Sequence, residues 1–263
     1  FTSAHRDSYS NMSPGMYHDM IVAGRVIGAP EMVHEAVNRF RTLMAQKFYF
    51  DGWWSEGAPS YHAQTVGNLM RVADAAKGYT DPEDCAGERF ENLDLESEVP
   101  TLAKAIGVMN EAVLPNGRPI PINDTWSTDK RNPLKESVSK LWPALGHGVL
   151  AAGKDDTQFQ IHLNWSGAYG HSQADNGSIL LFAFGREMLS DIGYSYGKRR
   201  EWTNVSASHN MVVVDEKSQI YGTPEKPTTG NLLFFEGDDD HVRVIDVDAS
   251  PGYEQCSDRK SVV

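Results

Sequence analysis

The chain has 263 residues, which allows one large domain or two smaller ones. Hydrophobic residues make up 40% and charged residues 23%, a balance that fits a folded protein and excludes a disordered or fibrous chain. The 36 acidic residues outnumber the 24 Lys and Arg residues, which gives a net charge of −12 and disfavours general nucleic-acid binding. No apolar run approaches the roughly 18 residues of a membrane span.

Two further features bound the class of protein. The cysteines, Cys85 and Cys256, lie far apart without a CxxC motif, so neither a zinc ribbon nor a disulfide framework is predicted, although one disulfide stays open. The first residues lack the basic and then apolar pattern of a signal peptide. The chain is therefore a mature protein, a fragment or a cytosolic protein.

Apolar residues in the first half recur at the spacing of helices. The spacing predicts one helix from Val33 to Phe48, a second after Pro59 that ends near Gly78, and a third from Val99 to Val113. Helices joined by Gly- and Pro-containing turns indicate antiparallel pairs. The long loop 115–133 contains four prolines, and such loops are often functional.

After about Leu145 the apolar period changes to two. Alternation predicts a strand over 158–165, and further strands are expected at 179–184, 211–214, 232–235 and 242–247. We therefore predict an α+β chain, with helical hairpins over residues 1–132 and an antiparallel β-sandwich over 133–263.

Aromatic and titratable side chains crowd the loop before the second helix. Trp54 and Tyr61 would suit a sugar-binding cleft, and the helix N-terminus there favours an anion. The alternative is a packing role for Trp53 and Trp54, with Tyr61 as part of the helix stripe.

Two clusters in the second half are also candidates. His171 lies in a polar loop before a strand, where it is either a general acid or base or a solvated side chain. Asp191 and His209 offer one oxygen and one nitrogen ligand for a metal, or His209 is a buried strand-edge residue. The basic run 198–200 suits carboxylate recognition through Arg199, or is a solvated turn.

Two motifs, GHSQADNGSILLFAFGREMLSDIGYSYG and SHNMVVVDEKSQ, give the chain a resemblance to the heparinase II/III-like polysaccharide lyases, including the oligoalginate lyases. The resemblance implies an incomplete α/α toroid followed by an antiparallel β-sandwich, and cleavage of uronic-acid polysaccharides by β-elimination. Since that architecture is longer than 263 residues, we expect this chain to be the central portion of a larger enzyme. Relatives of this kind also imply a periplasmic or secreted location.

The same resemblance assigns catalytic roles. Tyr61 corresponds to the catalytic Tyr, as general acid or as the group that moves both protons, and His171 to the base or carboxylate-binding His. Asn11 corresponds to the Asn that binds the substrate carboxylate. Tyr196 is the counterpart of a Tyr that serves as base in oligoalginate lyases, and His62, next to the acid, is a candidate substrate contact.

The resemblance also implies a structural divalent metal, usually zinc, held by Asp191 and His209. Gln173 occupies the position of the family's third ligand, where a second His is usual. Because glutamine is a weaker zinc ligand than imidazole, calcium or an empty, hydrogen-bonded site is an alternative. No organic cofactor is expected.

These residue types suit β-elimination. Neutral donors at the uronate carboxylate favour its enolate-like form by about 3 kcal/mol each, and a Tyr with a reference pKa of about 10 can protonate the leaving oxygen. The expected partner is an acidic polysaccharide, with alginate favoured because sulfate recognition calls for more basic residues. The alternatives are a glycosaminoglycan lyase and a non-catalytic carbohydrate-binding or scaffold protein.

Overall fold

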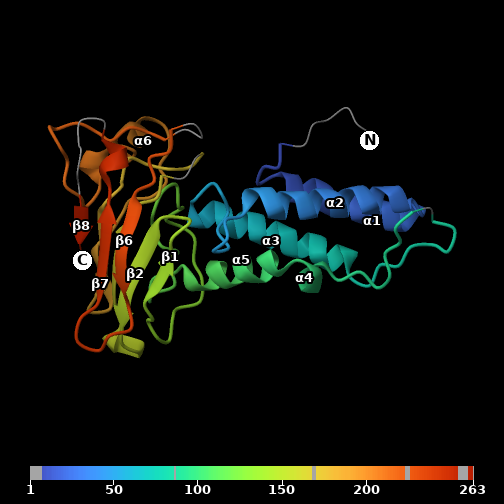
Figure 1. Ribbon diagram of the computed structural model, residues 1–263, viewed down its shortest axis with the longest axis horizontal. Coiled ribbons are helices and arrows are strands. Elements are labelled where there is room, and N and C mark those ends of the chain that lie inside the picture. The colour runs from blue at the N-terminus through green and yellow to red at the C-terminus, as the bar shows by residue number, and fades with distance from the viewer. Residues whose placement is uncertain (1–7, 86, 168–169, 223–225, 254–259, 263) are drawn as a thin grey trace. The chain divides into compact units, whose positions relative to one another are not determined.

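The computed structural model describes residues 8–85, 87–167, 170–222, 226–253 and 260–262. Its contacts divide the chain into two compact units (Figure 1). The helical unit comprises Phe1–Trp54 and Tyr61–Met109, and the sheet unit comprises Ser55–Ser60 and Asn110–Val263. The expected boundary between residues 132 and 133 lies later in the chain than this division.

The three predicted helices are confirmed, and an earlier one precedes them. In chain order the helices of the first half are α1 (Ser13–Ile27), α2 (Pro30–Lys47), α3 (Pro59–Ala76), α4 (Leu95–Glu98) and α5 (Pro100–Glu111). Pro30, Pro59 and Pro100 each occupy the first position of a helix, where the missing amide proton costs nothing. Gly28 ends α1 in the left-handed conformation, so α1 and α2 form a tight hairpin. No helix in the described ranges has the length and apolarity to span a membrane.

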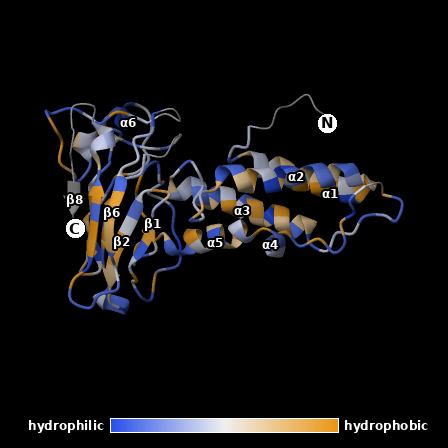
Figure 2. Cartoon of the chain, viewed as in Figure 1, coloured by the Kyte–Doolittle hydropathy of each residue, from blue (hydrophilic) through white to orange (hydrophobic). Residues whose placement is uncertain are grey.

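One apolar cluster holds the helical unit together. Each long helix contributes buried residues to it, and Figure 2 shows the hydrophobic residues of these helices in orange. Tyr17 from α1, Phe40 from α2 and Leu69 from α3 are fully buried in it. Burial of such a side chain contributes roughly 1.5–3 kcal/mol to stability. Because this burial needs apolar residues along one face of each helix, the helices can be recognised from the spacing of apolar residues in the sequence.

Two antiparallel sheets form the sheet unit. The first has the order β1 (Lys140–Trp142), β2 (His147–Ala152), β3 (Phe159–Asn164), β4 (Ser178–Ala183) and β5 (Arg186–Leu189). The second has the order β6 (Asn231–Glu236), β7 (Val244–Asp248) and β8 (Lys260–Val262). Short helices interrupt the strands: η1 (Asp155–Thr157), α6 (Lys198–Thr203), η2 (Ser206–Ser208) and η3 (Ser250–Gly252).

The two sheets share an apolar cluster. Leu163 and Trp165, in and just after β3, pack with Ile245 and Val247 of β7, and all four are nearly or fully buried. The prediction of antiparallel strands at 158–165, 179–184, 232–235 and 242–247 is therefore confirmed.

Strand prediction fails at two kinds of segment. The expected strand at 211–214 is wrong: Val212 is 70% exposed, and Asp215 and Glu216 have positive φ angles, which end any extended run. Strand β2 was missed because five of its six residues are buried, so it has no alternation to detect.

A chain of buried polar side chains crosses the first sheet. Gln158 Nε2 donates to the carbonyl oxygens of Leu134 and Asp155, and its Oε1 accepts from Ser137. Gln160 Nε2 then donates to Ser137 Oγ at 3.0 Å.

The directions of these hydrogen bonds fix the tautomers of two buried histidines, His162 and His147. Gln160 Oε1 is left as an acceptor, so His162 Nε2 donates to it at 3.0 Å. His162 Nδ1 must therefore accept, and His147 Nε2 donates to it at 3.0 Å. Burial lowers the pKa of His147 to about 4 and also lowers that of His162, so both rings are neutral near pH 7.

The lowered pKa of His147 predicts acid sensitivity. The unfolded chain takes up this proton near pH ~6.5, whereas the folded chain takes it up only near pH 4. Stability should therefore fall by on the order of 3 kcal/mol from this residue as pH drops between those values. Urea unfolding at pH 7 and pH 4.5 should show a smaller loss in His147→Gln than in wild type, and an unchanged loss in His241→Gln, which alters an exposed His. Equal losses in wild type and His147→Gln would contradict this.

Candidate active site

A fully buried carboxylate organises the site in the sheet unit. Asp124 lies in the proline-rich loop 115–133, between buried Asn123 and Thr125, and its side chain is completely inaccessible. The Asn123 Nδ2 donates to the carbonyl of Gly57 at 3.0 Å, which fixes this part of the loop. The Asp124 amide donates to the His171 carbonyl at 3.0 Å, so the backbone joins the two loops.

Three side chains compensate the buried carboxylate. Arg200 on α6 donates to both oxygens, at 2.6 Å and 2.7 Å, in the bidentate geometry that favours Arg over Lys. His171 Nδ1 lies 2.9 Å from Oδ2, and Gln173 Nε2 donates to Oδ1 at 3.1 Å. Burial alone would raise the pKa of Asp124, but the hydrogen bonds from His171, Arg200 and Gln173 outweigh it and lower the pKa.

The ionised carboxylate sets the chemistry of His171. Because a carboxylate only accepts, Nδ1 of His171 must carry the proton. The neutral ring then has its lone pair on Nε2, which is the form that acts as a base. Asp124 orients the ring through Nδ1, and the side chain, which is 23% exposed, still reaches solvent.

The turn after β5 approaches the Asp124 loop closely. The amide of Tyr194 donates to the Thr125 carbonyl at 2.9 Å. Gly193 has a φ of 69°, and a Cβ there would lie 2.3 Å from the same carbonyl oxygen, so only glycine fits. Tyr194 then lies under the Arg200 guanidinium, 4.9 Å from ring centroid to carbon, and its ring packs edge-on against Tyr196.

Exposed aromatic and basic side chains border this cluster. Tyr196 is 71% and Trp202 is 56% exposed, and Lys198 and Arg199 on α6 are exposed as well. Of the basic run, Arg200 rather than Arg199 contacts the His171 cluster. The surface of α6 thus combines positive charge with apolar ring faces.

A second buried group lies in the same unit. Asp175, Asp191 and His209 offer ligand atoms that all lie within 4.8 Å of one another. His209 Nδ1 is 2.6 Å from Asp191 Oδ2, and Asp191 Oδ1 accepts from the Gly193 amide at 2.7 Å. The turn at Gly193 therefore connects this group to the Asp124 loop.

The unsatisfied atoms of this group fit a divalent cation. Asp175 Oδ1 and His209 Nε2 are buried without a hydrogen-bond partner in the described part of the chain, which is costly for polar atoms. Burial raises the pKa of Asp175 to about 7. Burial would lower the pKa of His209, but its bond to Asp191 and the charge of Asp175 raise it. Two carboxylates and one imidazole are a ligand set that zinc accepts.

The third member of this group differs from the expected one. Gln173 is buried, and its Nε2 donates to Asp124, to the Asn123 carbonyl and to the Gly193 carbonyl. Its Oε1 has no hydrogen-bond partner in the described ranges, so a ligand role for Gln173 stays a prediction. The acidic side chain that the fold brings to Asp191 and His209 is Asp175.

Two predicted substrate contacts are wrong because their side chains are buried. Trp54 is 1% exposed and packs in the core of the helical unit, so its ring offers no sugar-stacking face. His62 is also 1% exposed. Its Nδ1 accepts from the Trp54 amide, and its Nε2 lies 2.9 Å from the Ala105 carbonyl. His62 is therefore a structural residue that fixes the loop before α3.

The remaining predicted residues belong to the helical unit. Asn11 lies in the turn before α1, and Tyr61 occupies the first turn of α3. Tyr61 is partly buried against the apolar cluster. Their catalytic roles stay predictions from the resemblance.

Three important residues were missed, for different reasons. Asp124 has no motif around it, although its loop was singled out as functional. Arg200 and Arg199 are indistinguishable in sequence, since only the helix geometry decides which one turns inward. Asp175 was visible as the last residue of the His-x-Gln-x-Asp pattern at 171–175, which could have suggested it as a ligand.

Comparisons with known proteins identify a protein family and a relative that are similar to this chain. The family described as "Heparinase II/III-like, C-terminal" matches residues 135–263. A heparin-sulfate lyase of Pedobacter heparinus is 22% identical, over 78% of this chain and 36% of its own length.

Solved structures show a similar fold. A crystal structure of heparinase III has a TM-score of 0.74 at 18% identity, over 97% of this chain and 45% of the other. The heparan sulfate lyase HepC from Pedobacter heparinus gives 0.72 at 18% identity, over 98% and 44%. The chain thus spans less than half the length of these relatives.

The metal-binding group predicts a stabilisation that depends on His209. Zn²⁺ at 100 times its dissociation constant should stabilise the fold by about 2.7 kcal/mol. Thermal unfolding with Zn²⁺ and with a chelator should show a smaller shift in His209→Gln than in wild type. His171→Gln, a nearby change outside the group, should keep the wild-type shift. An equal zinc response in wild type and His209→Gln would exclude this group as the ligand set.

Proposed function

We propose that the chain cleaves a uronic-acid glycosaminoglycan of the heparan sulfate type by β-elimination, because residues 135–263 match the heparinase II/III-like family. The observation that carries the proposal is the His171 ring, whose Nδ1 is held 2.9 Å from the buried Asp124 carboxylate. This arrangement supports a role for His171 as the base that removes a proton from carbon.

The substrate class rests on the relatives and on the surface of α6. The named relatives are heparin or heparan sulfate lyases, so a glycosaminoglycan is better supported than the alginate that the sequence favoured. Exposed Lys198 and Arg199 would attract carboxylate or sulfate groups, and exposed Trp202 supplies the sugar-stacking ring that Trp54 does not.

The proposed reaction is balanced in protons and electrons. His171 Nε2 removes the proton on carbon 5 of the uronate, and that electron pair forms the double bond between carbons 4 and 5. The bond from carbon 4 to the leaving oxygen then breaks. The resemblance assigns Tyr61 to protonate this oxygen and Asn11 to bind the carboxylate, with Tyr196 as the alternative base.

The proposed metal has a structural role. Asp175, Asp191 and His209, with Gln173 as a further candidate, would hold zinc, which would neutralise the two buried carboxylates and fix the Gly193 turn. No proton transfer passes through this group. Its contribution is the position of the loop that carries Tyr194 and Tyr196.

The proposal predicts a product with an unsaturated uronate. Incubation with heparan sulfate, heparin, hyaluronan and alginate should raise the ultraviolet absorbance of this group most with heparan sulfate. His171→Gln and Tyr61→Phe should each abolish the increase while far-ultraviolet circular dichroism stays unchanged. Binding without any absorbance increase on the four polymers would instead support a carbohydrate-binding protein.

Asp124 is predicted to act as a positioning residue. Asp124→Asn would let the amide donate to His171 Nδ1 and move the ring proton to Nε2, so kcat should fall by at least about a hundredfold with a smaller change in KM. Asp156→Asn, at an exposed acidic residue of the same unit, is the matched control. Wild-type kcat in a folded Asp124→Asn variant would refute this role.

A further inference from the structure

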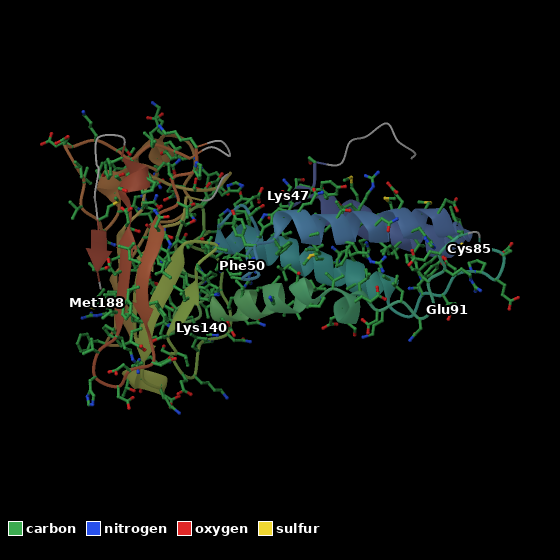
Figure 3. All side chains as sticks on the ribbon, in the orientation of Figure 1. Lys47, Phe50, Cys85, Glu91, Lys140 and Met188 are labelled. Carbon is green, nitrogen blue, oxygen red and sulfur yellow. The ribbon has the colours of Figure 1, made fainter. Side chains whose placement is uncertain are left out.

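A cavity in the helical unit contains a second cluster of metal-ligating side chains. The cavity has a volume of about 540 Å³ and lies between the start of α2 and the loop 77–94. Ligand atoms of His34, Asp81 and Cys85 lie within 4.8 Å of one another. Figure 3 labels Cys85 at the end of the helical unit, on the loop that also carries Glu91.

Asp81 is the fixed member of this cluster. Its side chain is fully inaccessible, and it accepts from the Tyr79 hydroxyl at 2.8 Å and from the Phe90 amide at 2.7 Å. Burial would raise the pKa of Asp81, but these bonds and His34 lower it. The carboxylate is therefore ionised and already oriented by two donors, as metal-ligating carboxylates usually are.

His34 and Cys85 complete the donor set. His34 Nε2 lies 2.7 Å from Asp81 Oδ2, and its ring stacks on Phe90 with centroids 4.1 Å apart. Cys85 is a half-buried free thiol that lines the cavity. The described residues contain no hydrogen bond between Cys85 and His34, so the pair lacks the thiol–imidazole contact of a nucleophilic site.

The charge around the cluster favours a cation. Glu31, Glu35 and Asp84 line the cavity together with His34 and Cys85, and none of its lining residues is Lys or Arg. Among the described residues, His34 is the one ion-pair partner of the buried Asp81. This acidic cavity is unsuited to an anionic polysaccharide and favours a cation.

We propose that His34, Asp81 and Cys85 form a metal site for a thiophilic divalent cation such as Zn²⁺, separate from the group around His209. A thiolate, an imidazole and a carboxylate match the ligands of zinc and leave a fourth position open to water. The bound ion would tie α2 to the loop 77–94, which is longer than most loops without structure of their own. Binding releases the thiol proton, because the thiolate is the ligand.

Cobalt distinguishes this site from the other. Titration of the reduced full chain with Co²⁺ should produce a thiolate-to-cobalt charge-transfer band, which the carboxylate and imidazole ligands around His209 cannot give. Cys85→Ser should abolish the band, and His34→Gln should weaken Co²⁺ binding by at least about tenfold. Zn²⁺ should compete the band away.

Matched variants make the result decisive. Cys256→Ser removes the other cysteine of the sequence, and Asp84→Asn removes a neighbouring cavity charge, and both should keep the band. Circular dichroism of the metal-free Cys85→Ser variant checks that the fold is intact. Absence of the band in wild type, or a band lost with Cys256 and kept without Cys85, would overturn the proposal.

Discussion

The buried carboxylate of Asp124 constrains the whole sheet-unit site. An ionised group without access to water is tolerated only when it is paired and hydrogen-bonded. Arg200, His171 and Gln173 meet this requirement, and they come from α6 and from the loop before β4. All three side chains bond to the carboxylate oxygens of Asp124. Because of these bonds, α6 and the loop before β4 cannot shift independently of the Asp124 loop. The hydrogen bond that His171 donates to the buried charge gives its ring a single orientation and tautomer.

The same constraint recurs deeper in the sheet. Asn164 at the end of β3 donates to Asp175 at 2.8 Å, and its Oδ1 lies 3.5 Å from His147 Nδ1. A separate run of buried bonds joins His147, His162 and Gln160. Apolar side chains would not need to be oriented in this way, since dispersion contacts, unlike hydrogen bonds, have no preferred direction. The bond between His147 and His162 therefore adds register to β2 and β3, and Asn164 connects the end of β3 to Asp175.

Sequence reasoning succeeded where one physical period dominates. The spacing that places Phe40 and Leu69 in one core predicted helices α2, α3 and α5, and alternation predicted β3. It failed where burial is two-sided, as in β2, or where aromatic residues have two plausible roles. Trp54 was assigned to sugar because the loop around it is polar, yet its indole is needed to fill the helical core. Asp124 could not be found, because its partners lie 47 and 76 residues away in sequence.

The proposed acidic substrate raises the question of where an acidic chain carries positive charge. Arg200 contributes little to long-range attraction, because Nη1 and Nη2 both donate to the Asp124 carboxylate, which offsets the charge. Lys198 and Arg199 are exposed on the same short helix and would supply positive potential beside His171. The bond from His171 Nδ1 to Asp124 orients the ring, so Nε2 is the nitrogen that could act as a base. If the proposed polyanionic substrate binds there, salt should weaken its binding.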